Sequence, residues 1–263
     1  MTMNDPAAAL APILGRTLLL APHPDDEAAG CGVLLQRIRE PHIAFLTDGA
    51  PHMRNFWARH GSRQMYAALR RREAQAASAI IGLRNVRFCE GVVDQDLFRS
   101  LEHAQDCLTG VIAELRPEAL LVPAFEGGHP DHDAASLLGC IAGKLASLPV
   151  WEFPLYHRST DGALVNQQFH ALTGGEVVIR PTPEQWDKKL RMFGEYVSQR
   201  EVLQHFLAET EVFRPLAKYD YSAPPHPGVL NYEAWQWGIT GGELAAAFSE
   251  HLHHQATPAE SAR

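Results

Sequence analysis

The sequence predicts an α/β fold in which a mostly parallel sheet carries helices on both faces. Short apolar runs that predict strands alternate with longer segments of helical period between residues 17 and 153. Apolar residues make up 46% of the 263 residues, which is enough for a substantial core. We find no internal repeat and no linker. We therefore expect one domain over 1–263, with a core at about 15–210 and an irregular C-terminal cap and tail at about 211–263.

Six apolar runs predict the strands. Each run is short and is bounded by turn residues or by a change to helical period, as is typical of strands that are buried on both faces of a parallel sheet. After Leu155 the alternation weakens, which favours a packed irregular cap over a second domain. The predicted strands are Thr17–Ala21, Ile43–Thr47, Val86–Cys89, Leu120–Val122, Val150–Phe153 and Val177–Ile179.

Five segments predict helices, and two of them have a clear start signal. Ser62 is a favourable N-cap, and Thr182 precedes Pro183, a residue favoured at the first helical position. The apolar stretch Ala7–Leu14 is too short to span a bilayer, so we expect a surface arm there, and we expect the tail from His251 to be frayed. The predicted helices are Glu27–Ile38, Arg63–Ile81, Leu101–Leu115, Asp131–Leu145 and Pro183–Phe206.

Charge and cysteine content restrict the class of protein. The formal net charge of -8 argues against a role at nucleic acids or at a membrane surface that depends on bulk charge. The four cysteines form no CxxC pair, so the sequence does not support a cysteine zinc site, and we expect reduced thiols of a cytoplasmic protein. We expect a small-molecule partner, no nucleic acid and no membrane, and homo-oligomer formation stays open.

Two clusters of histidines and carboxylates follow predicted strands. His23–Glu27 comes directly after the first strand, and His129–Asp133 follows the fourth. So many carboxylates would repel one another without a cation. In a doubly wound sheet these two strands are neighbours at the switch point, and ligands bind outside their carboxyl ends. We therefore expect the clusters to meet and to form a metal site.

Three side chains have the types and the spacing of metal ligands. His23 and Asp26 lie three residues apart, so one turn can point both at one ion, and His132 completes the set. Two histidines and one carboxylate leave an open position for water, as catalytic zinc requires. The same set could hold Fe2+.

The other polar residues of the clusters suggest catalytic roles. Asp25 is a candidate general base on the water that the metal makes acidic. His129 is a candidate to stabilise an oxyanion or to protonate the leaving group. Asp131 either orients a histidine or caps the following helix. We interpret Glu27 and Asp133 as acids in the first turns of helices.

These motifs resemble those of the PIG-L / LmbE-like family of zinc-dependent N-acetylglucosaminyl deacetylases. The likeness rests on the motif at Ala21–Glu27 and on HPDH at His129–His132, and Thr47–Gly49 is similar to the family's TDG turn. Here a proline separates the alanine from the histidine of the family's AHPDDE motif. The resemblance covers about residues 17–155 and implies a Rossmann-like, three-layer α/β sandwich.

The resemblance also implies an activity and the roles of site residues. By it, His23, Asp26 and His132 ligate zinc, Asp25 is the general base, and His129 stabilises the tetrahedral oxyanion. Family members typically remove the N-acetyl group of an amino sugar or glycoconjugate. Two other interpretations stay open: hydrolysis of a non-sugar N-acyl metabolite, and a catalytically silent metal- or sugar-binding protein.

Four further residues carry weaker signals. Arg54, in the loop after the second strand, is a candidate substrate contact because such loops form the rim of a site. We interpret Arg70 as part of a solvated helix face, although it could reach an anionic substrate group. Trp235 and Trp237 could stack on a sugar ring, but packing of the cap is the favoured interpretation.

Overall fold

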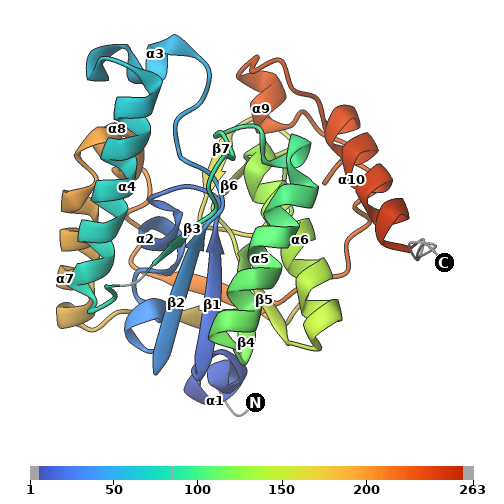
Figure 1. Cartoon of the computed structure of the whole chain (residues 1–263). Coiled ribbons are helices and arrows are strands. Elements are labelled where there is room, and N and C mark those ends of the chain that lie inside the picture. Colours follow the sequence, from blue (N-terminus) through green and yellow to red (C-terminus); the bar gives the residue numbers. More distant parts are fainter. Residues whose placement is uncertain (1–5, 85, 257–263) are drawn as a thin grey trace.

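A seven-stranded sheet forms the centre of the computed structural model, which describes residues 6–84 and 86–256 (Figure 1). Its strands are β1 (Arg16–Ala21), β2 (Glu40–Phe45), β3 (Arg87–Phe88), β4 (Ala119–Pro123), β5 (Val150–Phe153), β8 (Val177–Ile179) and β9 (Glu211–Pro215). The strand order is β3-β2-β1-β4-β5-β9-β8. The first five strands in this order are parallel, and β9 and β8 join antiparallel. A separate small sheet pairs β6 (Tyr156–Arg158) with β7 (Leu164–Asn166).

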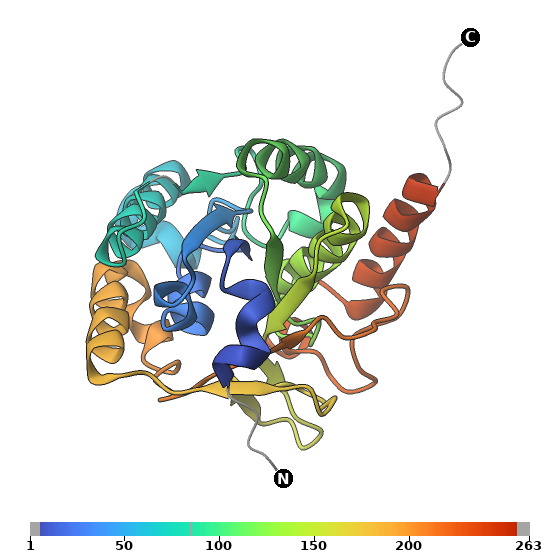
Figure 2. The ribbon, with the colours of Figure 1, turned by 90° about the horizontal axis from the view of Figure 1, so that it is seen from below.

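Helices cover both faces of the large sheet, so the molecule has three layers (Figure 2). On one face lie α2 (Asp26–Cys31), α4 (Arg63–Ile80) and α7 (Pro183–Glu195). On the other lie α5 (Leu101–Leu115) and α6 (Pro130–Ala146), with α10 (Gly241–Ala256) outside them. Shorter helices are α1 (Pro6–Leu10), α3 (Arg54–Trp57), α8 (Arg200–Leu203) and α9 (Asn231–Ala234). Within the part of the chain that the structure describes, no helix is both long and apolar enough to cross a membrane.

Strand β1 is buried on both faces because its side chains alternate between two cores. Leu18 and Leu20 pack with residues of α5 and α6, whereas Leu19 and Ala21 pack with residues of α2 and α4. All four side chains are 0% exposed. This double burial explains why the run is apolar throughout, as in the centre of parallel sheets.

The pairing of β1 with β4 is confirmed, and it places the two polar clusters at one edge. The strands are parallel neighbours, with Leu19 opposite Leu121. Their carboxyl ends therefore open on the same edge of the sheet, where ligands bind in doubly wound folds. The mostly parallel, Rossmann-like α/β fold is confirmed as well, with the antiparallel strands confined to one side.

Several predicted elements are confirmed at their bounds. α5, β5 and β8 begin and end where the sequence predicts. The Ser62 hydroxyl caps α4 by accepting a hydrogen bond from the N–H of Met65 at 3.2 Å. Thr182 and Gln185 form a capping box at the start of α7.

Helix α2 is shorter than the predicted Glu27–Ile38. After it ends, a 3-10 turn (Leu34–Gln36) follows. The buried carboxylate of Glu211 on β9 accepts hydrogen bonds from the backbone N–H groups of Val33 and Leu34, at 2.8 and 2.9 Å. In a continuous helix these N–H groups would bond to carbonyls one turn earlier. The helix therefore ends where a distant strand supplies other acceptors.

Two further segments differ from the predictions. The N-terminal stretch is not a surface arm: α1 and a 3-10 turn (Ala11–Ile13) bury Leu10 and Ile13 in the core. The helix that starts at Pro183 does not reach Phe206, because Tyr196 leaves the helical conformation with φ -83° and ψ 64°. The Tyr196 side chain is fully buried, and its hydroxyl donates to Glu27 on α2.

The C-terminal cap is more regular than predicted. It contributes β9 to the sheet and also contains α9 and α10. The predicted frayed tail is helical from His251 to Ala256, and the His251 ring forms a hydrogen bond of 2.7 Å with the Gln105 side chain on α5. Residues 257–263 of that tail lie outside the described residues.

The prediction that all four cysteines are reduced thiols is wrong for two of them. Cys89 and Cys107 form a disulfide that joins the end of β3 to α5. Cys31 and Cys140 are free. The disulfide therefore ties the loop after β3 to the helix that covers it.

A glycine pair tests how closely α6 approaches the sheet. A Cβ at Gly139 would lie 2.3 Å from Val122 Cγ1 on β4, whereas a Cβ at Gly110 on α5 would meet nothing within 4 Å. We expect Gly139→Ala to lower the free energy of unfolding by about 1–3 kcal/mol through overpacking. The control Gly110→Ala should raise it by about 0.5–1 kcal/mol, because alanine favours helix. Unfolding in guanidinium measures the free energy of unfolding of both variants. A value for Gly139→Ala equal to that of the wild type would contradict the close approach of α6 to the sheet.

Candidate active site

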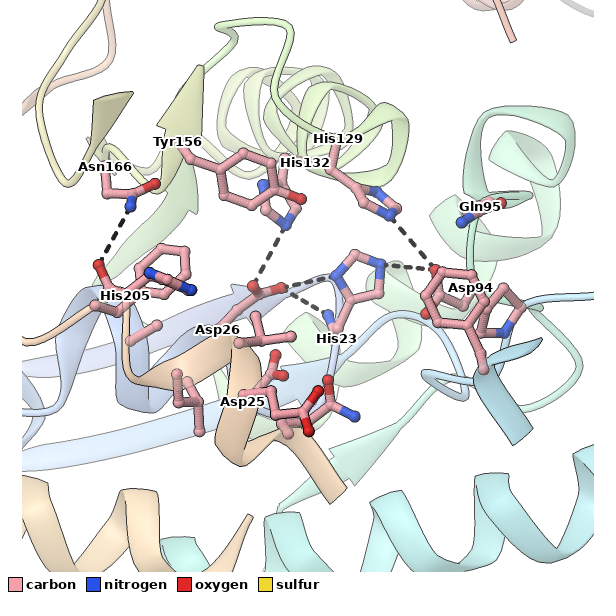
Figure 3. A pocket seen from close by; sticks show the side chains of 18 of the residues that line it. His23, Asp25, Asp26, Asp94, Gln95, His129, His132, Tyr156, Asn166 and His205 are labelled. Carbon is pink, nitrogen blue, oxygen red and sulfur yellow. Dashed lines mark hydrogen bonds and ion pairs between the residues drawn. The ribbon is translucent and has the colours of Figure 1, made fainter. Parts of the chain in front are cut away.

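A cavity of about 390 Å³ opens at the carboxyl edge of the sheet (Figure 3). Residues of both polar clusters line it: His23, Asp25, Asp26, His129 and His132. The rest of its wall comes from the loops after β2 and β3, from α3 and α4, from the segment 156–206, which includes β7 and α8, and from Trp235 and Trp237. Two motifs that are far apart in the chain therefore face one cavity.

The turn after β1 holds its side chains on a strained backbone. Asp25 has φ 131°, a value that costs a non-glycine residue about 1–3 kcal/mol and that is found at functional sites. The N–H of Asp25 donates to Glu27 Oε2 at 3.1 Å, and Glu27 Oε1 accepts from the Tyr196 hydroxyl at 2.5 Å. Glu27 lies in the first turn of α2 as predicted, but it is 0% exposed rather than solvated. It supports Asp25 through this hydrogen bond.

Asp26 lies between two imidazoles. Its Oδ2 is 3.2 Å from His23 Nδ1, and its Oδ1 is 3.3 Å from His132 Nε2. The three residues are only 2–6% exposed. His23, His129 and His132 also bring one ring nitrogen each within 4.8 Å of one another. Nitrogen and carboxylate donors of the kind that bind zinc thus converge on one buried point.

The charges of this group stabilise one another. Burial by itself would raise the pKa of Asp26, but His132 and His23 hold it well below its usual range. Burial would lower the pKa of His23, but Asp94, Asp26 and Asp131 raise it well above its ordinary value. His23 is therefore surrounded by carboxylates, an arrangement that favours positive charge at this point.

Arg70 holds Asp25 at the edge of the cavity. Its Nη2 donates to Pro24 O at 2.5 Å and to Asp25 Oδ2 at 3.2 Å. Arg70 is 4% exposed and lines the cavity, so its interpretation as a solvated helix residue is wrong. Burial raises the pKa of Asp25 to about 7, against the opposing charge of Arg70.

His129 is the N-cap residue of α6, and its hydrogen bonds indicate its tautomer. Its Nδ1 accepts a hydrogen bond from the N–H of Asp131 at 3.1 Å. A neutral imidazole that accepts at Nδ1 carries its proton on Nε2. That Nε2 lies 3.5 Å from Asp94 Oδ1 (Figure 3). Burial and the nearby His23 lower the pKa of His129, which favours the neutral form.

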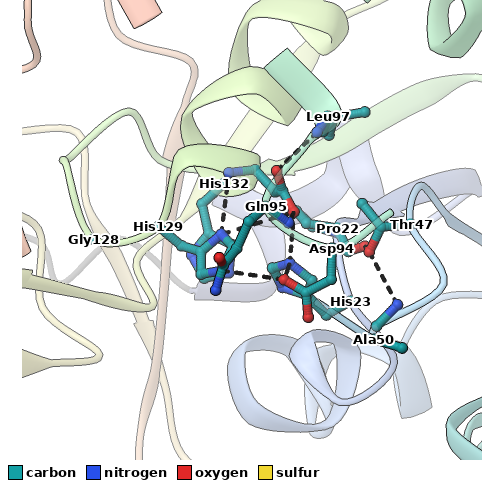
Figure 4. Close-up of polar contacts among 12 residues, drawn as sticks. Pro22, His23, Thr47, Ala50, Asp94, Gln95, Leu97, Gly128, His129 and His132 are labelled. Carbon is teal, nitrogen blue, oxygen red and sulfur yellow. Dashed lines mark hydrogen bonds and ion pairs between the residues drawn. The ribbon is translucent and has the colours of Figure 1, made fainter. Parts of the chain in front are cut away.

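Asp131 joins three segments of the site. Its Oδ2 lies 3.0 Å from His23 Nε2 and accepts from the N–H of Gln95 at 2.6 Å, and its Oδ1 accepts from the N–H of Leu97 at 3.0 Å. Gln95 lies in the loop after β3, and Leu97 begins the 3-10 turn that follows it (Figure 4). The geometry fits the expected orienting role, and the histidine that Asp131 contacts most closely is His23.

Asp133 is not an ordinary first-turn acid. It is 0% exposed, and its Oδ1 accepts from the N–H groups of Glu126 and Gly127, both at 3.1 Å. The Tyr232 hydroxyl donates to its Oδ2 at 3.4 Å. Asp133 therefore closes the loop that leads from β4 to His129.

Asp94 is a site residue that the sequence analysis missed. Its Oδ1 lies 3.4 Å from His23 Nε2 and 3.5 Å from His129 Nε2, and it lines the cavity. Burial would raise the pKa of Asp94, but His23 and His129 hold it well below its usual range. Asp94 and Gln95 follow the third predicted strand, so the rule that ligands bind at the carboxyl ends of strands could have found them.

Three residues with weaker signals have different positions in the structure. Arg54 is exposed on α3 and is absent from the residues that line the cavity, so its predicted contact with substrate stays a prediction. Trp235 and Trp237 both line the cavity, and Trp235 is 43% exposed. The interpretation as packing of the cap is therefore wrong for Trp235, whereas Trp237 is half-buried and packs against the core as well as lining the cavity.

Comparison with known proteins identifies relatives of this chain. Residues 18–142 match the family model PIG-L, described as GlcNAc-PI de-N-acetylase. The chain is 25% identical over 195 residues to the probable N-acetyl-alpha-D-glucosaminyl L-malate deacetylase 2 of Bacillus cereus, across 71% of this chain and 84% of the relative. It is 33% identical over 143 residues to the diacetylchitobiose deacetylase of Thermococcus kodakarensis, across 51% of each protein, so it spans about half of this second relative.

A solved structure agrees with the fold. A deacetylase of the teicoplanin biosynthesis pathway superposes with a TM-score of 0.62 and 18% identity, over 78% of this chain and 99% of that chain. At this identity the likeness concerns the fold alone. Both polar clusters, His23–Glu27 and His129–Asp133, lie inside the residues that match the family model. Residues 18–142 are thus similar to the PIG-L family, and the similar proteins named above are deacetylases.

Proposed function

We propose that this chain is a zinc-dependent hydrolase that removes an N-acetyl group from an amino sugar or glycoconjugate. The observation that carries the proposal is the convergence of His23, Asp26 and His132 with Asp25 and His129 on one cavity. The names of the relatives support the substrate class, since they refer to N-acetylated glucosaminyl malate and to diacetylchitobiose. The expected partner is therefore a small N-acetylated sugar.

The donor set fits a zinc ion. Asp26 already contacts His23 Nδ1 and His132 Nε2, so these three residues would hold the metal. His129 is excluded because its Nδ1 accepts from a backbone N–H and its Nε2 then carries a proton. We assign Asp131 to orienting His23 and not to the metal, because its oxygens already accept two backbone N–H groups and its Oδ2 lies 3.0 Å from His23 Nε2. Two imidazoles and one carboxylate are a ligand set of catalytic zinc and also suit Fe2+.

Asp25 is assigned as the general base. A divalent metal held by the three ligands would act as a Lewis acid that makes water acidic and polarises the amide carbonyl. Asp25 lines the cavity beside these ligands, and it takes a proton from the attacking water. Because its pKa is about 7, Asp25 can both take this proton and return it to the amine nitrogen as the C–N bond breaks.

His129 is assigned to the oxygen on which negative charge develops. Its Nε2–H is a donor that stands in place before the reaction, and such donors stabilise an oxyanion most strongly in a buried site. The N–H of Asp131 fixes the ring from one side, and the Trp237 ring packs against it at 5.0 Å. Arg70 orients Asp25 through its ion pair of 3.2 Å.

The role of Asp25 can be tested by an amide substitution of similar shape. We expect Asp25→Asn to lower kcat by about 10²–10⁴-fold, because proton transfer is lost, while zinc content stays unchanged. Amine release from N-acetylglucosamine derivatives and metal analysis of the same samples measure the two effects. Asp96→Asn is the control, because Asp96 is a half-buried carboxylate in the loop after β3 that does not line the cavity. Turnover of Asp25→Asn near the wild-type rate would sink the assignment.

The metal set can be tested through metal content. The wild-type chain should bind about one zinc per chain, lose activity with a chelator and regain it with zinc. His132→Ala should abolish this stoichiometric binding because it removes one of three protein ligands. His226→Ala is the control, since His226 is a buried histidine outside the cavity lining. Full zinc content in His132→Ala would show that another set of residues binds the metal.

A further inference from the structure

Four exposed apolar side chains surround the mouth of the active cavity. Phe56, Leu164, Val202 and Trp235 are 39%, 43%, 49% and 43% exposed, and all four line the cavity. They lie in or directly after four separate elements: α3, β7, α8 and α9. We call these four side chains the apolar rim. Apolar side chains scattered over a surface need no explanation, but a group of them around one cavity marks a binding surface.

An aromatic surface connects the apolar rim to the reacting centre. The Tyr156 ring lies 5.3 Å from the His132 ring and 6.0 Å from the Trp235 ring. On the other side, the Trp237 ring lies 5.0 Å from the His129 ring and 5.2 Å from the Trp235 ring. A substrate whose amide lies at His129 and His132 therefore meets aromatic side chains as far as the rim.

The cavity offers little to an anionic group on the substrate. Asp25, Asp26, Asp94 and Glu201 are the carboxylates that line it, and Arg70 is the one lysine or arginine among the described residues of its lining. Arg70 is 4% exposed and is paired with Asp25. Towards the mouth, the charged residue of the lining is Glu201, which repels an anion. An uncharged substrate group is therefore favoured.

We propose that the substrate of this site is an N-acyl amino sugar that carries an uncharged aryl or alkyl group, and that the apolar rim binds this group. This inference rests on the proposed deacetylase function. The cavity of about 390 Å³ lies within the size range of pockets that bury drug-sized ligands. The hydroxyls of a bare sugar would gain no hydrogen bond from the side chains of Val202 or Leu164. An aglycone and a longer N-acyl chain offer the same apolar chemistry, and the experiment distinguishes them.

The first test compares substrates that differ in one group. Amine release is measured for the methyl and phenyl β-glycosides of N-acetylglucosamine, for methyl N-octanoylglucosaminide and for N-acetylglucosamine 1-phosphate. We expect kcat/KM for the phenyl glycoside or for the N-octanoyl compound to exceed that for the methyl glycoside by about 10- to 100-fold, as burial of one ring or short chain implies. Preference for the phenyl glycoside places the apolar group on the aglycone, and preference for the N-octanoyl compound places it on the acyl chain. Equal values for all uncharged substrates, or a preference for the phosphate, would overturn the inference.

The second test assigns the preference to the apolar rim. Val202→Ser and Phe56→Ser should reduce the ratio of kcat/KM values between the favoured substrate and the methyl glycoside by about tenfold. Val178→Ser is the matched control, because Val178 is 48% exposed, as against 49% for Val202, and does not line the cavity. An unchanged ratio in both rim variants would overturn the inference. A change in sedimentation of the rim variants without a change in the ratio would place a second copy of the chain on the rim, and would overturn it too.

A binding measurement separates this inference from the proposed function. Calorimetry with the zinc-loaded Asp25→Asn variant measures affinity for the methyl, phenyl and N-octanoyl compounds without turnover. Tighter binding of an apolar compound, lost in the double variant with Val202→Ser, supports the apolar rim even if no amine is released by the wild-type chain. Amine release by the wild type together with equal affinities for all three compounds would uphold the deacetylase and reject the rim.

Discussion

The geometry of the site depends on the contacts that one buried carboxylate, that of Asp131, makes with neighbouring segments. It stands in the first turn of α6, accepts the N–H groups of Gln95 and Leu97, and lies 3.0 Å from His23 Nε2. One side chain thereby connects the loops after β1 and β3 with the helix after β4. A buried carboxylate is costly unless its lone pairs are satisfied, so these three segments are stable together in one arrangement. The parallel sheet brings the segments near one another, and Asp131 fixes their relative positions.

A buried ion pair between α7 and β9 supports the first motif. The Lys189 ammonium lies 2.7 Å from Glu211 Oε1, and both side chains are 0% exposed. Lys189 also donates to Ala29 O at 3.0 Å, while Glu211 accepts the N–H groups of Val33 and Leu34. Removing one partner of such a pair leaves an uncompensated buried charge, at a cost of about 3–5 kcal/mol. Residues beyond the family match, which ends at 142, therefore hold the helix that begins at the metal-site turn.

The sheet and both motifs could be predicted because their signals are local: apolar runs mark the strands, and polar residues follow them directly. The burial of charged side chains could not be predicted in this way, because it depends on contacts between residues that are far apart in the chain. Glu211 ends α2 from a strand that the sequence left in an irregular cap. Asp94 lies beyond a two-residue strand, and its loop is placed by Asp131. Arg70 is an instructive exception, since it shares a helical face with the buried Ala74 and Ala77, a spacing that indicated its burial.

At the position of Asp25, stability and activity favour different residues. A φ of 131° is unfavourable in any residue that has a Cβ, and a buried carboxyl whose pKa lies near 7 is a further cost at neutral pH. Glycine at this position would remove both costs, but it would also remove the proposed base and leave the buried guanidinium of Arg70 without its carboxylate partner. Selection for heat resistance alone would therefore favour chains in which Asp25 and Arg70 are replaced together, and such chains would lack the proposed base. A screen for a more robust catalyst has to select for turnover and thermal tolerance together.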